Sequence, residues 1–282
     1  MKQLKSSAAA AVVGLLLTPL HAAAQAQTDR WTFSLMPYLW LPGLDAKLNY
    51  GPPPGGGSSA NVGIDGEDIL EKLEAAFMLQ GEARKGRWLI TGDLIYLDFG
   101  GQKSQLRSVD FNPGTGPINI ATSQLDAGTK SSLDATVLSF AGGYNLLNEA
   151  GTTLDVIAGV RYIDVKVRTN WNLTAAVTGP AGAASIARAG SIERSTDLLD
   201  AIVGVRGRFQ LGTGSQWFVP YHVDIGAGSS DFTWQGVVGI GYAYKWGEVL
   251  LSYRYLQYEE GDNKFLQDLK LGGLGVGVNF RF

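Results

Sequence analysis

Three polar residues in the C-terminal third of the chain have the residue types of a hydrolytic triad: His222, Asp224 and Ser252. A serine nucleophile needs an adjacent base, usually histidine, and a carboxylate that orients this base. His222 and Asp224 are two residues apart, so within a strand their side chains lie on the same face. We weigh a hydrolase built on these residues against a simpler role, in which His222 and Asp224 pair with each other and with nearby arginines. We favour the simpler role.

Other chemistries are excluded by residue type or by context. The chain has no Cys, which removes disulfides, thiolate metal sites and cysteine nucleophiles. Residues 61–66 resemble the start of a calcium-binding loop, but its twelfth position is Lys72, where a bidentate acid is required. The glycines of residues 236–241 resemble a nucleotide-binding loop, yet they lie within a strand pattern that no helix follows. We therefore expect no cofactor and no metal ion.

The composition is unusual for a water-soluble protein. Of the 282 residues, 45% are hydrophobic and only 17% are charged, with a formal net charge of -3. The charged fraction lies below the typical quarter of soluble domains, yet the mean hydropathy is only +0.03. A slightly acidic chain also lacks the basic surplus that nucleic-acid binding requires, so no nucleic-acid partner is expected. Such a balance suits sheets with one apolar and one polar face.

The N-terminal residues have the layout of a secretory signal peptide. Lys2 and Lys5 precede a short apolar run, and small residues follow, with cleavage expected after Ala24 or Ala26. The apolar run is too short to cross about 30 Å of hydrocarbon as a helix, which argues against an N-terminal anchor. We expect residues 1–26 to be removed and residues 27–282 to form a single domain without a transmembrane helix.

The mature chain alternates apolar and polar residues with the period of two that is typical of strands. At its start, Trp31, Phe33 and Leu35 share one face, while Thr32 and Ser34 share the other. An exported chain without a transmembrane helix can span a membrane only as a closed barrel. The pattern therefore predicts an all-β, antiparallel, up-and-down transmembrane barrel. We expect about ten strands, with eight or twelve as alternatives, at residues 31–41, 75–84, 87–99, 133–147, 153–171, 197–211, 216–226, 232–246, 248–258 and 268–282.

The lengths of the connections orient this barrel. Every second connection is a tight turn, whereas three of the others are long and are expected to be loops, at residues 44–72, 100–132 and 172–196. Short periplasmic turns, longer extracellular loops and periplasmic termini are typical of barrels in the bacterial outer membrane. Residues 101–130, rich in Asn, Ser and Gly, are the contact surface that we expect at the cell surface.

Charged residues gather on the strand face that points into the barrel, while the opposite positions are apolar or aromatic. A charge facing lipid at the bilayer midplane would cost about 2–4 kcal/mol. The luminal charges either form a cross-linked core that locks the barrel or line a narrow channel. For ten strands we favour a largely filled lumen. This luminal polar network consists of Glu82, Arg84, Asp93, Asp155, Arg161, Asp200, Arg206, Arg208, His222, Asp224, Lys245, Glu248, Arg254 and Arg281.

One strand departs from this pattern. Asp134 and Thr136 share a face with Leu138 and Phe140, so an uninterrupted strand would turn polar and apolar residues to the same side. We expect a bulge or a register change within residues 133–147.

Aromatic residues mark both borders of the membrane, where amphipathic rings are favoured. A soluble β-sandwich, the alternative, would explain the alternation but neither the aromatic borders nor the charge-lined faces. We expect a periplasmic girdle of Trp31, Trp88, Phe209, Trp217, Trp246 and Phe280, and an outer girdle of Tyr96, Tyr162, Trp234 and Tyr255.

The last strand, residues 269–282, alternates apolar residues and ends on Phe280 and Phe282. This segment resembles the C-terminal assembly signal of bacterial outer-membrane barrels. The resemblance implies that the barrel-assembly machinery and periplasmic chaperones are partners during biogenesis, and that lipid and lipopolysaccharide surround the mature protein. Residues 31–43 and 68–98 resemble a proteobacterial family of small outer-membrane proteins akin to the opacity-protein and OmpW-like barrels. That family implies no settled activity and no oligomeric state.

For the function, the sequence favours a non-enzymatic protein of the outer membrane, with a structural or surface-interaction role or a narrow porin-like passage. The alternative is a barrel enzyme that acts on lipid or peptide at the extracellular rim. The omptin-like proteases also have ten strands, but His222 lies well down its strand, away from that rim. The likeness to them is one of strand number.

Overall fold

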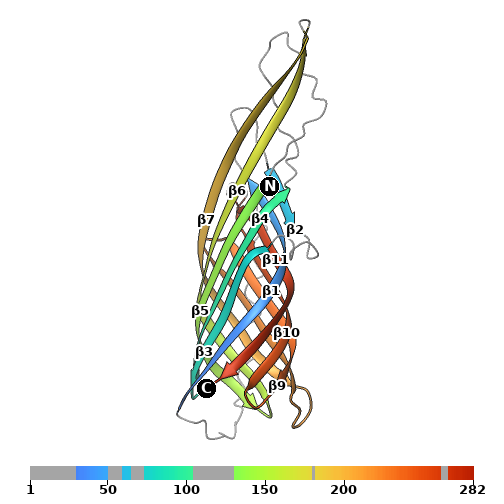
Figure 1. The fold of residues 1–282 in the computed structure, drawn as a ribbon. Helices are drawn as coiled ribbons and strands as arrows, with labels where there is room; N and C mark the ends of the chain where they lie inside the picture. Colours follow the sequence, from blue (N-terminus) through green and yellow to red (C-terminus); the bar gives the residue numbers. More distant parts are fainter. Residues whose placement is uncertain (1–29, 50–58, 65–72, 104–129, 180–181, 262–265) are drawn as a thin grey trace, which may run out of the picture.

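The computed structural model describes residues 30–49, 59–64, 73–103, 130–179, 182–261 and 266–282. These residues form one continuous antiparallel sheet (Figure 1). Among them, no helix is both long and apolar enough to cross a membrane. The strands are β1 (Trp31–Asn49), β2 (Ser59–Ile64), β3 (Leu73–Lys85), β4 (Trp88–Lys103), β5 (Lys130–Glu149), β6 (Thr152–Gly179), β7 (Gly182–Gln210), β8 (Trp217–Gly228), β9 (Phe232–Ala243), β10 (Gly247–Glu259) and β11 (Leu266–Arg281).

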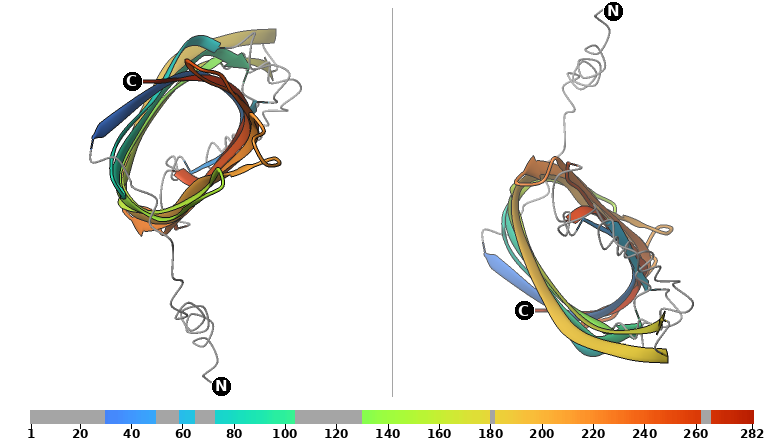
Figure 2. Two further views of the ribbon diagram at one scale, coloured as in Figure 1. Left: turned by 90° about the horizontal axis from the view of Figure 1, so that it is seen from below. Right: turned by 90° about the horizontal axis from the view of Figure 1, so that it is seen from above.

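The sheet closes on itself because β1 pairs with β11 along its whole length, from Ser34 opposite Arg281 to Leu48 opposite Leu266. Viewed along its axis, the barrel is a closed oval ring (Figure 2). Ten strands make this ring, which confirms the predicted antiparallel barrel. The additional strand, β2, pairs only with the outer half of β1, and thus lies within the predicted first loop.

Tight turns at one end of the barrel need left-handed backbone at a few positions. Gly86 links β3 to β4 with a φ of 58°, and Gly151 links β5 to β6 with a φ of 79°. Glycine adopts this region without the steric cost that a Cβ atom imposes. These turns lie at the same end as the C-terminus, which is the periplasmic end in the predicted orientation (Figure 1).

The prediction of a loop at residues 172–196 is wrong. β6 and β7 stay paired in register up to Gly179 opposite Gly182, and together they project beyond the other end of the barrel (Figure 1). Strand pairing needs no membrane, since each strand of the hairpin satisfies the backbone groups of the other. The sequence pattern marks only the part of these strands that faces lipid. Most of the predicted contact surface at residues 101–130 lies outside the described residues, and the predicted signal peptide lies wholly outside them.

A register shift does occur within residues 133–147, as expected, but it lies away from the charged residues that motivated the prediction. β5 pairs with β4 without interruption from Leu133 to Tyr144, and its single shift against β6 lies between Asn145 and Leu147, at the periplasmic end. Asp134 therefore does share an outward face with Leu138, but it lies opposite Asp98, beyond the Tyr96 position of the outer girdle. The strand simply leaves the lipid, so no bulge is needed to hide the charge.

The extracellular half of the lumen is filled with apolar side chains. The most deeply buried members include Phe99 and Ile163, both with 0% exposure. They share strand parity with luminal polar residues nearer the periplasm, so they point into the barrel rather than toward lipid. We call this group the apolar plug: Trp40, Leu44, Ala46, Met78, Ile95, Leu97, Phe99, Leu133, Ala135, Val137, Ile163, Val165, Val167, Leu198, Leu256, Tyr258, Leu266, Leu269 and Leu271.

The outer face of the barrel carries exposed apolar side chains, including Val203, Val238 and Leu251. Aromatic rings at the periplasmic border contact one another across strands. Trp217 contacts Tyr242 with a centroid separation of 5.0 Å, and Trp246 contacts Phe280 at 5.7 Å. At the outer border, Trp234 contacts Tyr255 at 5.0 Å. This belt, between two aromatic borders, is the surface that a transmembrane barrel turns to lipid.

Candidate functional site

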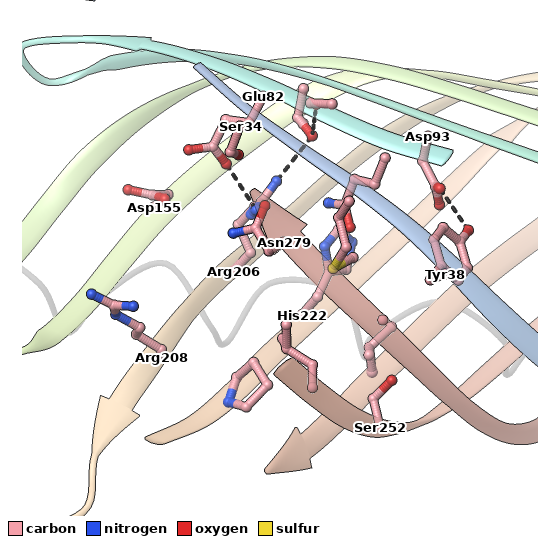
Figure 3. A pocket seen from close by; sticks show the side chains of 18 of the residues that line it. Ser34, Tyr38, Glu82, Asp93, Asp155, Arg206, Arg208, His222, Ser252 and Asn279 are labelled. Atoms are coloured by element: carbon pink, nitrogen blue, oxygen red, sulfur yellow. Dashed lines mark hydrogen bonds and ion pairs between the residues drawn. The ribbon is translucent and has the colours of Figure 1, made fainter. Parts of the chain in front are cut away.

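A cavity of about 730 Å³ occupies the periplasmic half of the lumen (Figure 3). Twelve of the fourteen predicted network residues line it, all except Asp200 and Lys245. Side-chain exposure falls with depth, from 51% at Arg281 and 30% at Arg208 to 1% at Arg161. The cavity is therefore open at the periplasmic end and ends blindly below the apolar plug.

The blind end is formed by side chains that meet across the lumen from six strands. Arg161 of β6 holds both carboxylate oxygens of Asp224 of β8 through one nitrogen, at 2.7 Å each. Arg254 of β10 forms an ion pair with Asp93 of β4 at 2.8 Å and donates to Tyr38 of β1 at 2.9 Å. Gln235 of β9 joins the two pairs, since it donates to Asp224 at 3.3 Å and accepts from Arg254. We call these residues the polar diaphragm: Tyr38, Asp93, Arg161, Asp224, Gln235 and Arg254.

The polar diaphragm contacts the apolar plug through Trp40. The Arg254 guanidinium lies over the Trp40 ring, 5.2 Å from its centroid. The indole nitrogen of Trp40 donates in turn to the Gly273 carbonyl of β11 at 3.2 Å. A cation over an aromatic face is stabilising, the more so where water is excluded. This contact couples the polar and apolar layers of the lumen.

Nearer the periplasm, two arginines link three strands. Arg84 of β3 holds Asp155 of β6 with two hydrogen bonds, at 3.1 and 2.7 Å. Glu82 accepts from Arg84 at 3.1 Å and pairs with Arg206 of β7 at 2.9 Å. Asn145 donates to Asp155 at 2.6 Å. Charge-assisted contacts of this kind are about twice as strong as neutral ones and hold their partners in a defined geometry.

At the mouth of the cavity, two cations share one carboxylate. Arg208 of β7 and Arg281 of β11 both pair with the same oxygen of Glu248, and Arg208 does so at 2.5 Å. Asn279 donates to the second oxygen of Glu248 at 3.0 Å. The mouth thus holds one more positive than negative charge.

Two predicted network residues lie elsewhere. Asp200 is fully buried at the outer end of the barrel, where it accepts from the backbone and the hydroxyl of Ser230, both at 2.8 Å. It therefore fixes the turn between β8 and β9. The luminal assignment of Lys245 is wrong, because this residue lies exposed in the periplasmic turn between β9 and β10. Strand parity does not extend into a turn, which is why the alternation misplaced it.

The three residues of the conceivable triad line the cavity, but their contacts do not form a triad. His222 Nε2 lies 2.6 Å from Asp224, so the nitrogen that would face a serine in the usual arrangement faces the carboxylate instead. Asp224 is also held by Arg161 and Gln235. Among the described residues, no hydrogen bond joins Ser252 to His222. In the same part of the chain, no group of three or more His, Asp or Glu side chains is placed to hold a metal ion.

Sequence reasoning missed the uncharged members of the site. Tyr38, Gln235, Asn145 and Thr91 each bond a charged luminal side chain. Thr91 shares the parity of Asp93 on β4, and the other three share the parity of buried luminal residues on their own strands: Trp40 on β1, Val137 on β5 and Thr233 on β9. A search of luminal positions for amides and hydroxyls, and not only for charges, would have identified them.

Comparisons with known proteins agree with this architecture. No protein-family model matches the chain, and no curated protein sequence matches it. Among solved structures, the chain is similar to the outer membrane protease OmpT of Escherichia coli, with 11% identity, a TM-score of 0.56, and coverage of 92% of this chain and 99% of that chain. It also matches Ail, the attachment invasion locus protein of Yersinia pestis, at 12% identity and a TM-score of 0.32, over 89% of this chain and 98% of that chain. Neisserial surface protein A matches at 10% identity and a TM-score of 0.29, over 89% of this chain and 97% of that chain.

The fold, the lipid-facing belt and the polar lumen together define this chain as a β-barrel of the bacterial outer membrane. The likeness to OmpT concerns the fold alone, and the two lower TM-scores carry no further argument. The structures named above do not assign the chain to the opacity-protein or OmpW-like barrels, so that resemblance stays a prediction.

Proposed function

We propose that this protein is a non-conducting outer-membrane barrel with a surface-interaction role. The observation that carries the proposal is the filling of the lumen by two successive layers, the polar diaphragm and the apolar plug. Arg161 and Asp224 in the diaphragm, and Phe99 and Ile163 in the plug, are each at most 1% exposed. A passage for polar solutes would require both layers to move apart. The arrangement supports a closed barrel over the narrow passage.

The projecting part of the β6–β7 hairpin supports the surface role. Within the described residues, β6 has no partner other than β7 beyond Asn170, and β7 gains its second partner, β8, only at Asp200. Among the residues that the structure describes, the hairpin therefore leaves the barrel as a two-stranded ribbon whose outer edges pair with no further strand (Figure 1). Free strand edges carry unpaired backbone groups, through which proteins often recognise extended partners.

Planar-bilayer recording of the refolded protein tests the closed lumen. We expect no discrete conductance steps. Steps that recur in every preparation of the wild-type protein would contradict a closed barrel and favour the narrow passage. Heat-dependent gel mobility in the same preparations verifies that the barrel is folded.

A shortened hairpin tests the surface role. Deletion of residues 173–188 together with Ala189→Gly would leave an Asn-Gly turn between Trp171 and Gly190, which face each other in the ladder, and this dipeptide suits a two-residue hairpin. We expect cells that display this variant to lose the aggregation and surface attachment conferred by the wild-type chain. Equal attachment at equal display would show that the hairpin is not the contact surface.

We propose further that the barrel is not a hydrolase. The saturation of Asp224 by Arg161, Gln235 and His222 supports this view, because a carboxylate so held has little freedom to orient a catalytic imidazole. If the protein hydrolyses a lipid or peptide ester after all, His222→Ala discriminates between mechanisms. Hydrolysis by the folded wild-type protein would itself contradict the proposal, and its loss in a folded His222→Ala variant would identify His222 as the base.

A further inference from the structure

We propose that the periplasmic cavity binds a small anion of the carboxylate or phosphate class, which enters from the periplasm. Arg208 and Arg281 attract the anion at the mouth, and Arg161 donates to it at the blind end. The inference is independent of the surface role, since it concerns the opposite end of the barrel.

The cavity has the size and access of a binding site. Its volume of about 730 Å³ falls within the range of about 300–1,000 Å³ that small-molecule pockets occupy. The half-exposed Arg281 marks its mouth, and the buried Arg161 marks its far end. Judged from the described residues, a ligand therefore enters and leaves the cavity through its periplasmic end.

The charge of the lining favours an anion. Among the described residues that line the cavity, the charged side chains are six arginines and five carboxylates, with no lysine. The surplus lies at the mouth, where Arg208 and Arg281 share the single carboxylate of Glu248. Guanidinium groups suit carboxylate and phosphate because their paired N–H groups match two oxygens of the ligand. The low dielectric constant of the protein around a cleft also focuses the electric field of such a surplus positive charge.

An unused donor lies at the blind end. Arg161 donates from Nη2 to Asp224 at 2.7 Å and from Nε to Ser139 at 3.2 Å. Its Nη1 is buried and has no hydrogen-bond partner. A buried donor without a partner is costly, and an arginine that lines a cavity can be satisfied by what the cavity holds. An oxygen of a group bound at the blind end would complete the donor set of Arg161 at Nη1.

Isothermal titration of the refolded protein in a non-ionic detergent tests the proposal. Citrate and inorganic phosphate serve as anionic probes, glucose as the neutral probe and spermidine as the cationic probe. We expect saturable binding of at least one anion at low salt, weaker binding at high salt, and no binding of glucose or spermidine. The difference between citrate and phosphate distinguishes a carboxylate from a phosphate ligand. Absence of saturable binding by both anions at millimolar concentrations would overturn the proposal.

Variants locate the site. Arg208→Gln and Arg281→Gln each remove the surplus charge and leave Glu248 one arginine partner, so neither creates an unpaired carboxylate. We expect each to weaken anion binding about tenfold, the fold-change that corresponds to the loss of one charge-assisted hydrogen bond. Arg168→Gln is the matched control, because Arg168 pairs with Glu193 on the exposed part of the hairpin, and we expect unchanged affinity.

The blind end needs a different variant. Removal of Arg161 alone would leave the buried carboxylate of Asp224 without its cationic partner. The double variant Arg161→Met/Asp224→Leu removes both charges together. Proteins tolerate the replacement of a whole buried ion pair by apolar residues better than the loss of one partner. We expect a folded double variant, verified by heat-dependent gel mobility, to bind the anion at least about tenfold more weakly. Wild-type affinity in Arg208→Gln, or in the folded double variant, would contradict the assignment of the anion to this cavity.

Discussion

Arg161 of β6 and Asp224 of β8 form an ion pair across the intervening strand β7, with Nη2 of Arg161 2.7 Å from each carboxylate oxygen. Gly204 is the β7 residue that lies opposite Asp224 in the ladder. A Cβ atom at Gly204 would lie 2.6 Å from the Cβ of Asp224. Glycine at this position therefore allows β8 to approach β7 closely at Asp224.

Asp224→Asn is expected to destabilise the barrel strongly. The Arg161 charge would remain buried without its counter-ion, and the loss of one partner of such a pair costs about 3–5 kcal/mol. Urea unfolding in detergent micelles, followed by tryptophan fluorescence, measures the free energy of unfolding. The double variant Arg161→Met/Asp224→Leu should recover most of the loss. A double variant as unstable as the single one would mean that packing, and not charge, dominates at this position.

Truncation of the apolar plug should cost more than truncation of the lipid-facing surface. Phe99 is 0% exposed within the plug, whereas Phe140 is 55% exposed on the outer face. Phe99→Ala leaves a cavity inside the barrel and should lower the free energy of unfolding by about 3–5 kcal/mol. Phe140→Ala should cost clearly less, because lipid or detergent chains can fill the space. The same unfolding experiment compares the two, and equal losses would show that Phe99 is not tightly packed.

A charge on the lipid-facing surface should be costly at the membrane centre and tolerated at its border. Leu251 lies midway along the outer face of β10, and Tyr244 lies at the periplasmic end of the aromatic belt. Leu251→Arg should destabilise the barrel by about 2–4 kcal/mol, and Tyr244→Arg by about 1 kcal/mol or less. Unfolding from lipid vesicles measures both values. If Leu251→Arg proves as mild as Tyr244→Arg, the placement of the membrane along β10 is wrong.

Asp134, beyond the outer girdle, should make stability depend on pH. Partial burial and the hydrogen bond and charge of Asp98 raise the pKa of Asp134 above its ordinary value. A raised pKa means that the folded state holds the proton more tightly than the unfolded state, so stability falls as the pH rises through the carboxyl range toward neutrality.

Asp134→Asn removes this effect. At neutral pH the variant should be slightly more stable than the wild type, by less than about 1 kcal/mol for so exposed a pair. Below the ordinary pKa of aspartate the two proteins should be equally stable, because Asp134 is then protonated in both states. Unfolding curves at neutral and at acidic pH measure the difference. A variant that is less stable than the wild type at neutral pH would show that the pair does not repel.

The sequence alone determined the sheet, its closure and its two faces. Alternation places Trp31 and Phe33 opposite Thr32 and Ser34, because successive side chains of a strand point to opposite sides. The need to satisfy every backbone group in lipid then leaves only a closed barrel. The same alternation along β6 and β8 predicted that the side chains of Arg161 and Asp224 point into the lumen.

Only the tertiary structure decided which luminal residues meet. The partner of Arg161 is Asp224 rather than Asp200, although Asp200 is its direct neighbour in the ladder. Partners across a barrel depend on strand tilt, stagger and the oval shape of the ring, and none of these is encoded in the local alternation. The apolar plug was missed for a similar reason. Ile95 and Leu97 alternate with the outward Leu94 and Tyr96, so both faces of β4 are apolar there, and period two by itself cannot tell a filled lumen from a lipid-facing surface.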